Sequence, residues 1–336
     1  MPRSAYRLVA TLLSAALAGS AVTAVTAAAA TPTACTKTEL SLPAGTPAEA
    51  SSRVKSSDDT GRYVVGTVQL LDGTSYPVLW SDGVPQQLDA DSALVDSVMD
   101  VNSDGTVLGA TLTEEGPQLP WLYSNGKYEY LKAPDGMDWM SARAINNRGD
   151  VVGNGFDDAT GAFTAVVWPA GGAAQRLPGT PTSGATDIDD SGAVVGYAQD
   201  GKLGDTGFLW ENWDAPGVPL TGRGGERSSL NEIRGTWIRG AEIQEEGFAG
   251  VLWSTQSTQI TPFEVPAQGL NSAGDVAMVN DKGVSFVERR DGTRYEFPER
   301  TFVRHLIERG HGIDAVADTP FTGDAPTRAI LWSGCS

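Results

Sequence analysis

A unit of about 43 residues recurs along this chain, and it limits the possible fold more than any other feature of the sequence. One half of the unit is a short apolar strand that ends in an aromatic residue, as in Pro77–Trp80 and Gly250–Trp253. Self-similarity at this spacing indicates that each unit is one supersecondary element. The seven end positions lie 34 to 45 residues apart and are Trp80, Tyr123, Trp168, Trp210, Trp253, Val287 and Trp332.

The other half of the unit is an apolar residue, a polar turn with glycine, two branched apolar residues and a second glycine. Clear copies are Val101–Gly109, Ile145–Gly153 and Ile188–Gly196. Glycine supplies the positive φ that tight hairpins need, and paired valines favour strands. Each unit therefore offers four short strands, and no helical period is visible. The sequence predicts an all-β fold, a seven-bladed β-propeller; the alternative is a two-sheet sandwich.

The chain ends give a second constraint. The last unit stops soon after Trp332 and lacks a fourth strand, whereas Thr36–Pro43 has alternating leucines and belongs to no unit. We expect this N-terminal strand to close the last blade. That closure would bring together Cys35 and Cys335, the two cysteines of the chain, as a disulfide. The alternative is lipidation of Cys35, which Pro32 disfavours.

The N-terminus has the features of an export signal. Arg3 and Arg7 precede an apolar run from Leu8 to Val25, which ends in small residues. We interpret residues 1–30 as a secretory signal peptide, cleaved between Ala28 and Ala34, and residues 35–336 as a single propeller domain. The alternative is a membrane anchor, but the strongly apolar part is short for one. We expect a secreted, extracellular protein.

The charge of the mature chain limits the kinds of partner that it can bind. Without the signal it carries 22 Lys and Arg against 42 Asp and Glu, a net charge of about −20. Such a surface repels phosphate backbones and anionic lipid headgroups. We therefore expect no nucleic-acid partner, no membrane association after cleavage of the signal, and a monomer.

The unit resembles a known repeat. An Ile-Asn-Asn-x-Gly-x-Val-Val-Gly half followed by a strand ending in Leu-Trp is similar to the bacterial extracellular HAF-repeat family, over most of residues 55 to 333. None of the seven copies has the His-Ala-Phe run that names the family, and Thr206–Trp210 comes nearest. The resemblance implies a diverged, secreted, β-propeller-like repeat protein and carries over no catalytic residue.

The long, variable loops of the units are the predicted binding surface. In a propeller, the second-to-third and fourth-to-first loops share one face, and variable loops on a rigid scaffold commonly hold binding sites. These loops are acidic and carry some aromatic residues; the alternative is that they are merely solvated. The predicted binding residues are Glu114, Glu115, Trp139, Phe156, Asp157, Asp158, Asp205, Glu245, Glu246 and Asp318.

Signals for a cofactor or catalysis are scarce. The stretches Asp100–Gly105 and Asp187–Gly192 resemble half of a calcium loop, but no Glu closes them, and we favour plain turns. The two histidines, His305 and His311, exclude a multi-histidine metal site. No nucleophile motif is present. We therefore expect no cofactor and no metal, and identify no catalytic residue.

These observations favour a binding module over an enzyme. The expected function is a secreted interaction module that recognises carbohydrate or a protein partner through the acidic-aromatic loops. The alternative is an extracellular hydrolase or lyase that uses paired carboxylates in the mouth of the propeller.

Overall fold

The computed structural model describes most of the mature chain. The described residues are 35–88, 95–113, 118–179, 182–199, 205–223, 227–244, 247–257, 260–263, 265–308, 312–323 and 325–335. Their regular structure is entirely β, with 28 strands. In this described part, no helix is long and apolar enough to cross a membrane. Residues 33–336 form one compact unit, and the predicted signal peptide, residues 1–30, lies outside the described residues.

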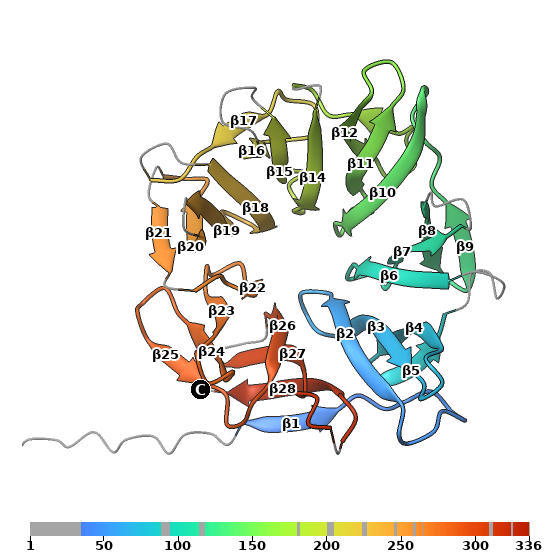
Figure 1. Cartoon of the computed structure of the whole chain (residues 1–336), viewed down its shortest axis with the longest axis vertical. Helices are drawn as coiled ribbons and strands as arrows, with labels where there is room; N and C mark the ends of the chain where they lie inside the picture. The colour runs from blue at the N-terminus through green and yellow to red at the C-terminus, as the bar shows by residue number, and fades with distance from the viewer. Residues whose placement is uncertain are drawn as a thin grey trace, which may run out of the picture. The chain divides into compact units, whose positions relative to one another are not determined.

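Four antiparallel sheets contain four strands each, in chain order (Figure 1). The first comprises β2 (Ser51–Ser57), β3 (Tyr63–Gln69), β4 (Ser75–Ser81) and β5 (Val84–Gln87). The second comprises β14 (Ser183–Ile188), β15 (Val194–Gln199), β16 (Asp205–Trp210) and β17 (Val218–Leu220). The third comprises β18 (Arg227–Arg234), β19 (Trp237–Gln244), β20 (Gly247–Ser254) and β21 (Ile260–Phe263). The fourth comprises β22 (Gly269–Leu270), β23 (Val276–Val279), β24 (Ser285–Glu288) and β25 (Arg294–Glu296).

An eight-stranded sheet joins two successive four-stranded meanders. One meander has β6 (Val95–Val101), β7 (Val107–Leu112), β8 (Gln118–Ser124) and β9 (Lys127–Tyr130). The other has β10 (Met137–Ile145), β11 (Val151–Asp157), β12 (Ala162–Trp168) and β13 (Gln175–Arg176). A single partner pair, Met140 with Gln118, links them. The first strand of each meander lies innermost, around a common centre (Figure 1).

The last sheet closes the ring in the predicted way. It combines β26 (Phe302–Ile307), β27 (Ile313–Asp318) and β28 (Ala329–Cys335) with the N-terminal strand β1 (Thr36–Glu39). Strand β1 pairs antiparallel with β28, so that Thr36 lies opposite Ser333. The disulfide Cys35–Cys335 joins the residue directly before β1 to the last residue of β28. The predictions that the N-terminal strand completes the final sheet and that the two cysteines pair are confirmed.

The repeated aromatic residue lies in the third strand of its meander and is buried. Trp80, Trp168, Trp210 and Trp253 are each at most 5% exposed. Burial of an indole requires a partner for its N–H. Each of the four donates to a backbone carbonyl on the segment that leads into its own meander or closes it; for example, Trp80 Nε1 donates to Ser41 O at 2.7 Å.

The repeated glycine of the second strand is required there for a steric reason. Gly66, Gly153, Gly196 and Gly240 lie in second strands, each opposite the residue that precedes a β-bulge in the innermost strand. A Cβ at any of the four would lie 2.0–2.1 Å from a carbonyl oxygen of the innermost strand. The bulge thus brings two backbones closer together than a side chain permits.

The turn asparagines join neighbouring meanders. Asn102 and Asn146 each use the side-chain oxygen to close their own turn, accepting N–H groups two and four residues ahead. Their side-chain amides then donate to the next turn along the chain: Asn102 to Asn146 O at 3.1 Å and Asn146 to Asp189 O at 3.0 Å. The motif residue therefore sets both the turn and the contact between meanders.

We expect the substitution Gly196→Ala to destabilise the fold by about 2–3 kcal/mol, because its Cβ would overlap Gly184 O. The matched control is Gly269→Ala. Gly269 is also in a strand, but the nearest atom to its added Cβ lies 3.6 Å away. Urea unfolding of both variants checks this; equal stabilities would contradict the steric role of the repeated glycine.

Reduction of the disulfide should lower the free energy of unfolding by about 3–5 kcal/mol, because the crosslink restricts a very long loop in the unfolded chain. The measurement is urea unfolding with and without dithiothreitol. A Cys35→Ser/Cys335→Ser double variant serves as the control and should not respond to the reductant. A wild-type unfolding curve that is unchanged by full reduction would refute the role of the crosslink.

Candidate functional site

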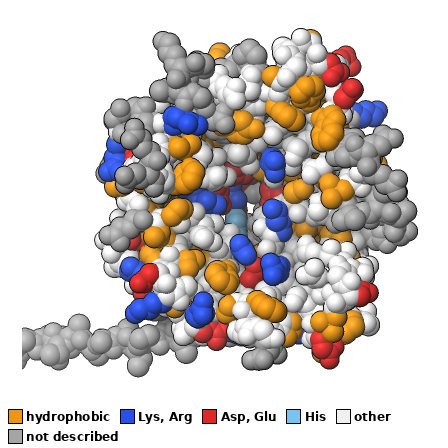
Figure 2. Space-filling model, in the orientation of Figure 1, with side chains coloured by type: hydrophobic (Ala, Val, Ile, Leu, Met, Phe, Trp, Pro, Cys, Tyr) orange, Lys and Arg blue, Asp and Glu red, His pale blue; other side chains and the backbone are white. Residues whose placement is uncertain are grey.

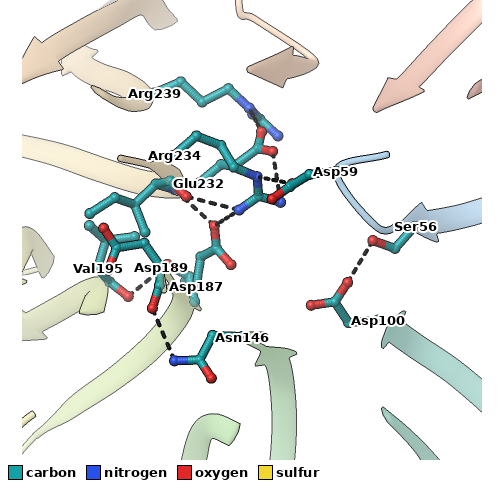
Figure 3. Close-up of polar contacts among 12 residues, drawn as sticks. Ser56, Asp59, Asp100, Asn146, Asp187, Asp189, Val195, Glu232, Arg234 and Arg239 are labelled. Atoms are coloured by element: carbon teal, nitrogen blue, oxygen red, sulfur yellow. Dashed lines mark hydrogen bonds and ion pairs between the residues drawn. The ribbon is translucent and has the colours of Figure 1, made fainter. Parts of the chain in front are cut away.

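A cluster of charged side chains lies at the centre of the ring (Figure 3). It consists of Asp59, Asp100, Asp187, Glu232, Arg234, Arg239 and His305, and we call it the axial cluster. Four of these residues come from innermost strands at the position directly after the β-bulge: Asp100, Asp187, Glu232 and His305. The repeat therefore places them at the same level around the axis.

Arg234 is the hub of the cluster. Its guanidinium lies 3.0 Å from Asp187 Oδ2, 3.3 Å from Glu232 Oε1 and 3.6 Å from Asp59 Oδ1. Arg239 pairs with the other oxygen of Glu232. Asp59 belongs to the first meander, whereas Arg234 ends β18, so these ion pairs link segments far apart in the sequence. Buried charges persist only when they are paired in this way.

Two of the carboxylates also bind the next meander through its backbone. Asp100 Oδ2 accepts the Ile145 N–H at 3.0 Å, and Asp187 Oδ2 accepts the Ile233 N–H at 2.8 Å. Asp100 Oδ1 accepts the Ser56 hydroxyl at 2.6 Å. The cluster therefore holds neighbouring meanders together as well as balancing charge.

The carboxyl groups of the cluster differ in their pKa. Burial raises the pKa of Asp187 to about 7 against the opposing charge of Arg234, and burial likewise raises that of Asp100. For Glu232, burial is outweighed by Arg239 and Arg234, and its pKa lies below the usual value. His305, at 3.8 Å, and then Arg234 lower the pKa of Asp59. The carboxyl group of Asp187 thus changes charge near neutral pH.

A cavity of about 310 Å³ lies on the side of the ring where the first-to-second hairpin turns meet, which we call the turn side. Asp59, Asp100 and Arg234 border it from the axial cluster. The remaining wall consists mostly of the turns themselves, and the other acidic residues along it are Asp58, Asp189, Asp190 and Glu308. The opposite ends of the strands form the loop side.

Basic side chains approach the centre from the innermost strands. Arg53 and Lys55 of β2, Arg143 of β10 and Arg304 of β26 are exposed. Lys55, Arg143 and Arg304 each occupy the position skipped by the register shift of their strand. Figure 2 shows basic side chains gathered around a central hollow, with a histidine visible inside it.

The sequence-predicted loop residues have diverse surroundings. Trp139 is 46% exposed and pairs across strands with the half-buried Phe156, which contacts Phe163 at 5.4 Å. Asp158 is exposed. Asp157 and Asp318 are buried and paired with Arg176 and Arg304, so these two carboxylates do not lie on an open surface. Glu114, Glu115, Glu245, Glu246 and the side chain of Asp205 lie outside the description.

Reasoning from the sequence missed both the axial cluster and the basic side chains. Asp100 and Asp187 begin the two calcium-like stretches, and both belong to the axial cluster. The overlooked signal was a charged residue two positions before the turn residue, as in Asp100, Asp187 and Glu232. The partners of these charged residues come from other meanders and meet them only because the ring closes.

The calcium-like stretches are hydrogen-bonded turns. Asn102 Oδ1 and Asp189 Oδ1 accept backbone N–H groups of their own turns at 2.9–3.1 Å. Within the described residues, no group of three or more His, Cys, Asp or Glu side chains is arranged to hold a metal ion.

Comparison with solved structures identifies the fold. The chain is similar to an oligogalacturonate lyase from Vibrio parahaemolyticus, with a TM-score of 0.59 and 8% identity over 88% of this chain and 93% of that one. It is also similar to the β-propeller domain of the Trilobed protease from Pyrococcus furiosus, with a TM-score of 0.57 and 10% identity over 84% and 94%. These likenesses define a β-propeller-like protein. No protein-family model and no curated protein sequence matches the chain.

The pKa of Asp187 predicts a pH-dependent stability. Because the folded-state pKa is about 7 and the unfolded value about 3.9, the unfolded chain loses this proton first as the pH rises. This group therefore stabilises the fold below about pH 4, and the contribution is lost between pH 4 and 7. From pH 5 to pH 8, the wild type should lose about 2 kcal/mol more than Asp187→Asn, which cannot titrate there.

Urea unfolding at pH 5 and pH 8 measures this difference. Asp104→Asn, at an exposed turn position, is the control and should follow the wild-type pH dependence. An identical pH dependence in the wild type and Asp187→Asn would show that Asp187 does not titrate in this window.

Proposed function

We propose that the protein is a secreted, seven-bladed propeller that binds carbohydrate on the loop side of the ring. Trp139 carries this proposal. It is 46% exposed and lies near the loop-side end of β10, beside the exposed Asp138. An accessible indole beside polar groups offers a flat apolar surface for the C–H face of a sugar ring.

The blade count rests on the meanders. The eight-stranded sheet contains two four-stranded meanders linked by one partner pair, and counting each meander as a blade gives seven. The resemblance to the HAF-repeat family and the N-terminal export signal agree with this interpretation. The disulfide is compatible with an oxidising compartment. We therefore place the protein outside the cell, as a diverged member of that family.

The bonding of the axial cluster favours binding over catalysis. Glu232 is held by two arginines, Asp187 by Arg234 and a backbone N–H, and Asp100 by a backbone N–H and a hydroxyl. These bonds commit the carboxylates to the scaffold. In this proposal the axial cluster forms the rigid floor of the channel.

A second candidate function is that of an extracellular hydrolase or lyase. The observation that favours it is the pKa of Asp187, raised to about 7, which suits a general acid. One structural neighbour is an oligogalacturonate lyase, but at 8% identity that likeness concerns the fold alone. The two candidates differ in whether a bound saccharide is recovered intact.

The test is a glycan array probed with the oxidised mature protein. We expect retention of a subset of oligosaccharides, loss of that retention in Trp139→Ala by at least tenfold in affinity, and no change in Phe248→Ala. Phe248 is the matched control because it is an exposed aromatic residue in β20, outside the innermost strands. The absence of any saccharide binding, or equal losses in the two variants, would refute the proposal.

Incubation of the retained oligosaccharides with the protein distinguishes binding from catalysis. Mass spectrometry should recover them unchanged. Cleavage that disappears in Asp187→Asn while affinity persists would establish the enzymatic alternative instead.

A further inference from the structure

We propose that the channel mouth selects anionic oligosaccharides, those that carry uronic-acid carboxylates, through Arg53, Lys55, Arg143 and Arg304. This inference rests on the proposed function and specifies its ligand class. It starts from a contrast in charge: the whole chain has a formal net charge of −18, yet Arg53, Lys55, Arg143 and Arg304 are exposed on innermost strands. Figure 2 shows basic side chains around the central hollow, next to acidic ones.

The bulges of the innermost strands position three of these cations. In β2, β10 and β26 the register shift falls at Lys55, Arg143 and Arg304. A bulge turns the extra residue out of the regular pleat, and this re-aiming recurs beside binding sites. The equivalent residues of β6, β14 and β18 are Met99, Thr186 and Asn231, so the cations belong to particular strands and are not a property of the repeat.

Most of this positive charge is uncompensated. Within the described part of the chain, Arg53, Lys55 and Arg143 form no ion pair. Arg304 Nε lies 2.8 Å from Asp318 Oδ2, which leaves the rest of its guanidinium exposed. Asp318 is itself buried and accepts the Val54 N–H at 2.7 Å, so it fixes Arg304 to the wall of β2. Asp318 also interacts electrostatically with Arg53, so this carboxylate balances part of the charge of both arginines.

The proposed carbohydrate ligand specifies the class of anion. A saccharide that carries carboxylates contains uronic acids, and guanidinium and ammonium groups form charge-assisted hydrogen bonds with carboxylates. A long nucleic acid would meet the acidic exterior, which repels phosphates. A short anionic saccharide can reach Arg53, Lys55, Arg143 and Arg304 without covering that acidic exterior.

The experiment measures binding of a mannuronic acid tetrasaccharide by isothermal titration calorimetry. Its carboxyl methyl ester, which has the same rings without the charge, is the neutral probe. We expect binding of the acid, binding of the ester weakened at least tenfold, and a loss of affinity for the acid as salt rises. Lys55→Gln and Arg143→Gln should each lower the affinity for the acid about tenfold, since each removes a charge-assisted hydrogen bond.

The matched control is Lys127→Gln, an exposed lysine on the outer strand β9, which should bind the acid like the wild type. Melting curves of all variants verify that they are folded. Equal binding of acid and ester would overturn the charge inference but leave the carbohydrate proposal intact. An equal loss in Lys127→Gln would also overturn it, by showing non-specific attraction. Binding of polyglutamate or single-stranded DNA in place of any saccharide would overturn both.

Discussion

The closure of the ring is the constraint on which the rest of the structure depends. Strand β1 pairs with β28, and Cys35 is bonded to Cys335, so that the first and last meanders become neighbours. Asp318 of the last sheet accepts the backbone N–H of Val54 in the first, and Arg304 is anchored to the same carboxylate. Without closure, the innermost strands would have no common centre. Neither the axial cluster nor the group of exposed basic residues on these strands could then assemble.

One structural position of the repeat serves two purposes. The bulges of β2, β10 and β26 turn Lys55, Arg143 and Arg304 out of the sheet. The bulges of β6, β14, β18 and β26 place the next residue in the axial cluster, namely Asp100, Asp187, Glu232 and His305. The glycine of the second strand is the steric condition for the bulge, because any Cβ would overlap the backbone opposite it. A sequence feature that seems to belong to a turn motif therefore controls the chemistry at the axis.

The axis separates two electrostatic environments. On the turn side, a cavity lies above carboxylates that Arg234 neutralises in part. Among the exposed cations of the innermost strands, Arg304 is paired with Asp318, whereas Lys55 and Arg143 form no ion pair in the described structure. The ion pairs of the axial cluster cross between the first and third of the four-stranded sheets, so the floor is rigid. Rigid, charged surroundings of this kind suit a preorganised ligand site, since little side-chain entropy is lost on binding.

The sequence by itself determined the all-β class, the four-stranded unit, the terminal strand pairing and the disulfide. These follow from local spacing: paired valines, turn glycines and a strand left over at each end of the repeat. It did not determine the burial of Asp157 and Asp318 or the meeting of Asp59, Arg234 and His305. Those depend on which side chains face the axis and on partners from distant units. Such contacts are decided by bulge geometry and ring closure, which only the tertiary structure specifies.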